Sequence, residues 1–449
     1  MIVGSVDSNN YITNYTNKAG HICKDFNTST DTCNDQYKVS DFYILAPGTT
    51  ISTNNAGGTS TMTGTSMAAP IVTGSVAVIS QMWPYMKGEN IVQLLLSTAD
   101  KDIPEYNENT HGQGLLDLDA ATEPQGAVGI PTTGRTTSSV STVSLSNSGG
   151  SGSSISAFAN NDKLSSIMIV DSYARDYYVD LTSNITVVDT RKVSDVVAMQ
   201  NNLPYLAHNQ MFGSFSQGGQ WDMGYMSFGL YSGESGNGDW SSNVSKTFSI
   251  HNNFELTTTV GSMLETETWL GNASDGALAV GGDNTTNFAQ IGFAYTMDNN
   301  KLTLDFSEGH TKVNTINNSL IKSMDKLETQ SVKLGFESNI TDRKKWGITY
   351  SLPSRITNGN SHISVPYATT SSGEVVYENV AVDMSAKSKE QNIGFFFASQ
   401  GEEDTEWTTN FNIEYRNNIA GEDGNNAVIS NFGVSKKFWG SCQFLWMKN

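Results

Sequence analysis

Several features that other classes of protein require are scarce in this chain. Its 449 residues include only three cysteines, and their spacing gives none of the four-ligand patterns of structural zinc. Basic residues number 26 against 45 acidic ones, which gives a net charge of −19 and argues against a nucleic-acid partner. No apolar run reaches the length of a membrane-spanning helix. The acidic residues are dispersed, as on a solvated surface.

The cysteines leave two alternatives open. Cys23 and Cys33 lie ten residues apart in a polar stretch and can close a short disulfide, or both can be free thiols. Cys442 lies close to the end of the sequence and has no evident partner.

The most informative segment is Gly64–Gly74, which reads Gly-Thr-Ser-Met-Ala-Ala-Pro-Ile-Val-Thr-Gly. Ser66 opens an apolar helical run that continues to about Trp83. A serine there lies beside unpaired N–H groups and the positive end of the helix dipole, which can stabilise an oxyanion. Pro70 fits an early turn of the helix. The alternative is that Ser66 is only a helix cap.

The whole string resembles the nucleophile motif of the subtilisin-like serine proteases. Flanking segments are similar to this family as well: the strand Ile2–Asp7, the loop Ile12–Gly20, the Ala-Pro-Gly turn within Tyr43–Gly48 and the closing segment His111–Asp117. The resemblance implies peptide-bond hydrolysis of polypeptide substrates, with Ser66 as nucleophile and its backbone N–H in the oxyanion hole.

The family's catalytic Asp and His and its oxyanion Asn precede the serine in sequence, in segments that would lie before Ile2 here. We therefore expect residues 1–122 to be the C-terminal part of a catalytic domain, and this chain to be a fragment with negligible activity alone. His21 and His111 are expected in loops not directed at the serine. The remaining histidines, which follow residue 160, are expected to be solvated: His208, His251, His310 and His362.

No cofactor or metal is expected in this chain. Many subtilisin-like proteases bind structural calcium, so the resemblance implies such a site in the intact family domain. The residues present here offer no dense acidic loop for one.

After residue 122 the composition changes twice. Residues 123–160 are rich in Ser, Thr and Gly and are predicted to be a linker. Residues 161–210 form a junction segment, with a strand at Ile167–Val170 and an amphipathic stretch at Arg175–Leu181.

Residues 211–449 alternate apolar and polar residues with a period of two, as in Leu302, Leu304 and Phe306. We predict roughly ten to twelve antiparallel strands joined as meanders. A transmembrane β-barrel and a soluble β-sandwich both fit this pattern.

The order of these parts resembles the autotransporter-type proteases of Gram-negative bacteria. That resemblance implies an α/β subtilisin-like domain lacking its N-terminal part, followed by an all-β barrel in the outer membrane, with the protease at the cell surface or secreted. Phe438 fits the aromatic end of such a barrel, but residues 439–449 continue past it. The competing hypothesis is a non-enzymatic surface β-domain, an adhesin or binding protein with a protease remnant.

Overall fold

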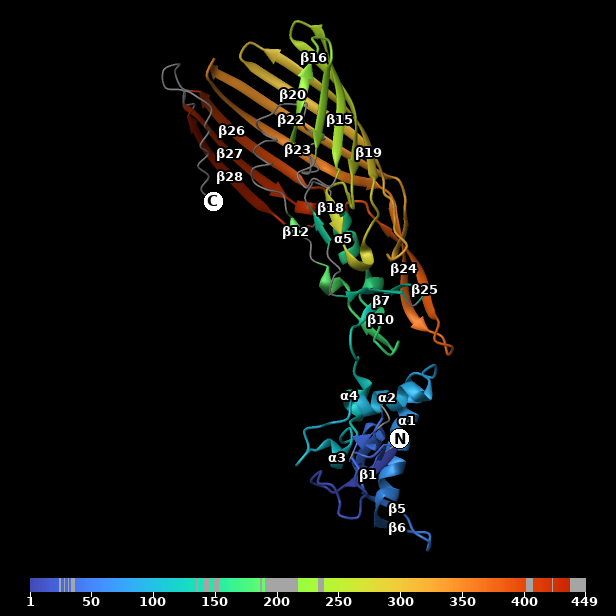
Figure 1. Ribbon diagram of the computed structural model, residues 1–449. Helices are drawn as coiled ribbons and strands as arrows, with labels where there is room; N and C mark the ends of the chain where they lie inside the picture. Colours follow the sequence, from blue (N-terminus) through green and yellow to red (C-terminus); the bar gives the residue numbers. More distant parts are fainter. Residues whose placement is uncertain are drawn as a thin grey trace. The chain divides into compact units, whose positions relative to one another are not determined.

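The computed structural model describes residues 1–23, 26–27, 29–30, 32–33, 37–134, 136–140, 145–147, 153–185, 188–189, 217–232, 238–400, 407–421 and 423–436 (Figure 1). The chain forms two compact units. Unit 1 contains Met1–Gly129, Met168–Tyr177 and Ala368–Val376, and unit 2 contains Ile130–Ile167, Tyr178–Tyr367 and Tyr377–Asn449. Both units therefore draw on segments that are distant in sequence.

Residues 1–122 form an α/β region, as expected. Its elements in chain order are β1 (Ile2–Val6), β2 (Phe26–Asn27), β3 (Thr32–Cys33), η1 (Val39–Phe42), β4 (Tyr43–Pro47), β5 (Thr49–Thr53), β6 (Thr59–Thr63), α1 (Thr65–Met82), α2 (Gly88–Ser97), α3 (Glu108–His111) and α4 (Leu118–Thr122). Strands β1 and β4 are parallel, with Val3 opposite Ile44. Leu115 continues this arrangement through a parallel bridge to Leu45.

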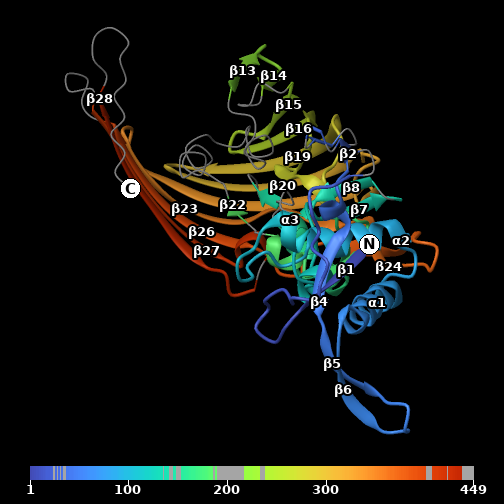
Figure 2. The ribbon, with the colours of Figure 1, turned by 60° about the horizontal axis from the view of Figure 1, so that its bottom comes forward.

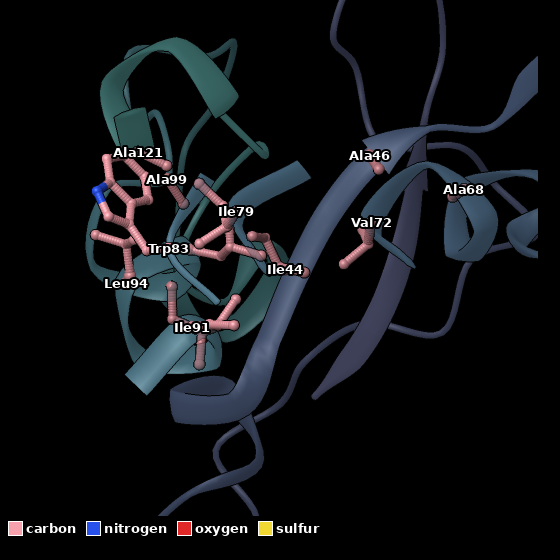
Figure 3. Packing of buried hydrophobic residues seen from close by; sticks show 12 residues of the cluster. Ile44, Ala46, Ala68, Val72, Ile79, Trp83, Ile91, Leu94, Ala99 and Ala121 are labelled. Atoms are coloured by element: carbon pink, nitrogen blue, oxygen red, sulfur yellow. The ribbon is translucent and has the colours of Figure 1, made fainter. Parts of the chain in front are cut away.

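Helix α1 contributes Ala68, Val72 and Ile79 to the core of unit 1. Pro84 follows its C-cap Trp83 and ends the helix, because the residue before a proline is disfavoured in the α conformation. The buried face of α1 packs with α2, α4 and β4 (Figure 3). The buried cluster consists of Ile44, Ala46, Ala68, Val72, Ile79, Trp83, Ile91, Leu94, Leu95, Leu96, Ala99 and Ala121.

The segment predicted to be a linker, residues 123–160, contains regular elements in its described part. These are β7 (Gly129–Thr133), β8 (Thr136–Ser139), β9 (Leu145–Asn147) and α5 (Ser153–Ala159). Ile130 and Phe158 are fully buried. The structure thus divides the chain differently from the ranges that the composition suggests.

The described residues of the predicted junction also form regular elements. It holds η3 (Asp162–Leu164), β10 (Ile167–Val170), β11 (Asp176–Val179), η4 (Thr182–Asn184) and β12 (Val188–Asp189). The strand expected at Ile167–Val170 is confirmed as β10, which pairs antiparallel with β7. His208 and Cys442 lie outside the described residues.

An antiparallel sheet of eleven strands dominates unit 2 and confirms the predicted meander. Its strands are β13 (Gln217–Asp222), β14 (Ser227–Ser232), β15 (Trp240–His251), β16 (Phe254–Glu265), β19 (Asn284–Met297), β20 (Asn300–Lys312), β22 (Leu327–Thr341), β23 (Lys344–Asn358), β26 (Gln391–Gln400), β27 (Trp407–Asn417) and β28 (Ala427–Lys436). The strands follow this order across the sheet. Figure 2 shows the sheet as strongly curved, with β13 and β28 at its two ends.

Shorter elements lie between the long strands. They are β17 (Thr268–Trp269), β18 (Asn272–Ser274), η5 (Gly276–Leu278), β21 (Ile321–Met324), β24 (Asn360–Thr369), β25 (Val375–Asp383) and η6 (Ile419–Gly421). Strands β12, β9, β18 and β17 form one small sheet in that order, and β21, β24 and β25 form another.

The long strands expose apolar side chains and bury polar ones. In β20, Leu302, Leu304 and Phe306 are 48%, 42% and 40% exposed, whereas Asp305 and Ser307 between and beside them are buried. The same alternation recurs in neighbouring strands. Exposed apolar residues of this face include Val260, Ile291, Phe293, Leu334, Ile348, Ile393, Phe411, Ile413 and Phe432. A sheet in water normally does the opposite and buries its apolar face.

Candidate active site at the start of helix α1

Ser66 is the second residue of α1 and its side chain is exposed. The N-cap Gly64 has φ 153° and ψ 164°, a conformation that side-chain-bearing residues rarely adopt. The Gly64 carbonyl accepts the N–H of Met67 at 2.9 Å. Helix geometry leaves the N–H groups of Thr65 and Ser66 without intrahelical partners, so they can serve an anionic ligand.

Pro70 lies in an early turn of the helix, as the sequence predicts. It is the sixth residue of α1, in the second turn. Its missing N–H would otherwise bond to the Ser66 carbonyl four residues earlier, so this carbonyl loses its usual helical donor. The proline therefore weakens the helix locally at the candidate nucleophile.

The Ala-Pro-Gly turn fixes the approach to α1. The N–H of Gly64 donates to the Gly48 carbonyl at 2.8 Å, and the N–H of Gly48 donates to the Val6 carbonyl at 3.0 Å. A Cβ at Gly48 would lie 1.7 Å from Ser5 Oγ, so only glycine fits. Hairpin β5–β6 spans the residues between this turn and Ser66, with Thr49 paired to Thr63. Ser66 is thus tied directly to the β1–β4 sheet.

Among the described residues, none forms a hydrogen bond with the Ser66 hydroxyl. None of them is therefore placed to act as the base for this serine. His111 ends helix α3 instead of lying in a loop, and it is buried. Its Nδ1 accepts the N–H of Asn107 at 3.0 Å, which makes it a structural residue. His21 is exposed. The other described histidines lie in strands of unit 2: His251 in β15, His310 in β20 and His362 in β24.

Two further polar groups of unit 1 have structural roles. Cys23 is disulfide-bonded, which excludes the alternative that both Cys23 and Cys33 are free thiols. The Tyr43 hydroxyl donates to the Asn17 carbonyl at 2.6 Å, and burial raises the pKa of Tyr43 to about 12. Tyr43 therefore stays a neutral hydrogen-bond donor and cannot act as a base near neutral pH.

The described residues contain no group of three or more His, Cys, Asp or Glu side chains arranged to hold a metal ion. None of the helices in the described part of the chain has the length and hydrophobicity needed to cross a membrane.

Unit 1 also contains a buried ion pair that the sequence analysis did not predict. Arg175 and Asp171 are both fully buried and lie 2.7 Å apart. The Arg175 guanidinium also donates to the carbonyls of Ala121 and Glu123, at 2.5 and 2.8 Å, and lies 4.6 Å from the Trp83 ring centroid. Residues 168–177 are thereby bound to the end of α4 and to α1. An Arg-Asp pair four residues apart in a run of tyrosines is the only sequence signal for it.

Comparison with known proteins gives one family and several distant structures. The family model of the subtilase family matches residues 1–116. No curated protein matches the chain.

Three of the similar solved structures are the toluene transporter TbuX of Ralstonia pickettii, the outer membrane protein OmpT of Vibrio cholerae and the translocator domain of the autotransporter NalP from Neisseria meningitidis. Each is 10% identical to this chain. The matches cover 49%, 48% and 51% of this chain and 71%, 61% and 76% of those chains, with TM-scores of 0.28, 0.27 and 0.22. Scores this low support no functional conclusion. The family match, in contrast, covers the motif around Ser66, and residues 1–116 of this chain are similar to the subtilase family.

Proposed function

We propose that this chain carries the nucleophile half of a serine endopeptidase and anchors it in the outer membrane of a Gram-negative bacterium, in the manner of an autotransporter. The observation that carries the enzymatic part is the position of Ser66, exposed at the N-terminus of α1 within a subtilase segment.

In the proposed reaction, Ser66 Oγ attacks the carbonyl carbon of a peptide bond. The hydroxyl proton passes to a base and from there to the leaving amine as the C–N bond breaks. Water then hydrolyses the acyl-enzyme and restores the hydroxyl. The Ser66 N–H and the start of α1 stabilise the negative charge on the carbonyl oxygen in both steps.

The base, its carboxylate and the side-chain oxyanion donor come, in this proposal, from polypeptide other than the described residues. A serine hydroxyl is a weak nucleophile without an adjacent base. We therefore expect negligible proteolysis by this chain alone. The lack of a base beside Ser66 among the described residues also favours a second candidate function. In that case the chain is a surface β-domain whose protease remnant has no activity.

Labelling with a fluorophosphonate probe tests the nucleophile. We expect no labelling of the chain alone, and labelling once a polypeptide with the subtilase Asp and His segments is supplied. Ser66→Ala should then abolish the label, whereas the matched Ser60→Ala in strand β6 should retain it. Equal labelling of Ser66→Ala would contradict the assignment of the nucleophile. Labelling of the chain alone that depends on Ser66 would show that it already contains a base.

The sheet of unit 2 supports the membrane part of the proposal. Its strands reach 12 to 15 residues in β15, β16, β20, β22 and β23, longer than the 9–11 residues that a tilted strand needs to cross a bilayer. One face of the sheet exposes apolar side chains, and the opposite face carries buried polar ones. This is the pattern of strands with one side in lipid. A soluble sandwich would bury such an apolar face against a second sheet, whereas the apolar side chains of this face are exposed.

A further inference from the structure

Unit 2 is assembled from two stretches of chain that lie on either side of residues 190–216. The first stretch lies within residues 130–189, without Met168–Tyr177, and the second begins at residue 217. Strand β9 comes from the first stretch and pairs antiparallel with β18 from the second, with Leu145 opposite Ser274 and Asn147 opposite Asn272. Strand β12 then pairs parallel with β9. One small sheet therefore joins both stretches by backbone hydrogen bonds.

The strand that receives β9 is held in place by its own hairpin. The fully buried carboxylate of Glu265 accepts the N–H groups of Leu270 and Gly271, at 2.7 and 2.8 Å, in the turn between β17 and β18. Trp269 on this hairpin is fully buried, and Asn284 donates to the Thr268 carbonyl at 2.7 Å. These contacts involve only the second stretch, so β18 presents a fixed edge to β9.

Side chains add contacts beside this sheet. Lys322 Nζ donates to the Thr132 carbonyl at 2.7 Å, and Thr133 Oγ1 donates to the Asn317 carbonyl at 2.7 Å. A hydrogen bond from a charged donor contributes more than one between neutral groups.

The β24–β25 hairpin contributes three further contacts. Tyr377 donates to the Gly134 carbonyl at 3.0 Å, Tyr178 donates to the Tyr367 carbonyl at 3.2 Å, and Lys163 forms an ion pair with Glu378 at 2.9 Å. All contacts described in this subsection lie within unit 2.

We propose that these contacts form a noncovalent clasp between residues 130–189 and residues 268–378, and that the clasp retains residues 1–189 on the eleven-stranded sheet when the chain is cut between residues 190 and 216. The surface formed by residues 268–378 thus binds the N-terminal part of the same chain. The clasp does not depend on Ser66 being catalytic. It means that cleavage in this interval does not by itself release the subtilase segment.

The test uses the full chain with a recognition sequence for a specific protease inserted between residues 200 and 210. The chain is folded in detergent micelles, cut to completion and separated by size-exclusion chromatography. We expect the two fragments to elute together. Elution of the N-terminal fragment by itself would overturn the proposal.

Matched variants identify the contacts responsible. Lys322→Met removes the charged donor to Thr132 and should give about tenfold more free N-terminal fragment, whereas Lys326→Met, an exposed lysine nearby, should give no change. Ala273→Pro removes an N–H from β18, and Ala273→Ser keeps it. If each variant behaves like its control, the clasp does not hold the fragments together and the proposal fails. Heat-dependent electrophoretic mobility of the sheet fragment reports whether Ala273→Pro folds. If it does not fold, the comparison of Lys322→Met with Lys326→Met decides the outcome.

Discussion

At the scale of single residues, Arg175 holds residues 168–177 against the rest of unit 1. Its buried guanidinium is paired with Asp171 and bonded to two carbonyls at the end of α4. Arg175→Met leaves the Asp171 carboxylate buried without its partner, and we expect it to lower the free energy of unfolding of unit 1 by about 3–5 kcal/mol. Hydrogen exchange of peptides from α1, followed over a range of urea concentrations, measures this loss.

Arg175→Lys is the matched control for this prediction. A lysine keeps the charge but loses the planar fork that reaches Asp171 and both carbonyls together. It should therefore show a smaller loss than Arg175→Met. Unchanged protection of α1 in Arg175→Met would mean that residues 168–177 do not stabilise unit 1.

At the scale of elements, two glycines beside the candidate site have opposite surroundings. Gly48→Ala would force a methyl group against Ser5, which is fully buried, so we expect a loss of about 1–3 kcal/mol. Gly74→Ala, in the middle of α1, meets nothing within 4 Å and should stabilise the helix by about 0.5–1 kcal/mol. Urea unfolding of both variants checks the signs, and a stable Gly48→Ala would show that the turn can move.

The elements that could be predicted from the sequence are those whose signals are local. Helix α1 begins one residue before Ser66 and ends one residue before Trp83, because the Gly-Thr start, the apolar run and Pro84 mark it. The alternation in Leu302, Leu304 and Phe306 likewise predicts strand β20.

Strand β9 could not be predicted in the same way. It lies in a Ser, Thr and Gly-rich segment, and its order comes from pairing with β18 more than a hundred residues later. The environment of Arg175 has the same origin, since its carbonyl partners are 54 and 52 residues earlier. Composition shows whether a segment can bury its own apolar surface, but it does not show which distant edge the segment meets.

At the scale of the whole molecule, the exposed apolar face of the eleven-stranded sheet makes the membrane proposal testable. Ile291 lies within β19 and is 43% exposed, whereas Ile250 is the next-to-last residue of β15 and is 60% exposed. If the sheet lies in a bilayer, Ile291→Lys should cost about 2–4 kcal/mol near the midplane, and Ile250→Lys at the strand end only about 0–1 kcal/mol.

Urea titration of folding into lipid vesicles, followed by heat-dependent electrophoretic mobility, measures both costs. An equally small effect of the two lysines would contradict a lipid environment for this face. Efficient folding of both variants without lipid would favour a soluble sheet.

The side-chain contacts between the two stretches of unit 2 also determine when the protein can finish folding. They join residues that are between 184 and 243 positions apart. Unit 1 likewise includes Ala368–Val376. A chain made from its N-terminus exposes the subtilase segment to its surroundings long before these partners are synthesised. The contacts of Ala368–Val376 within unit 1, and those between the two stretches of unit 2, can therefore form only after most of the polypeptide exists.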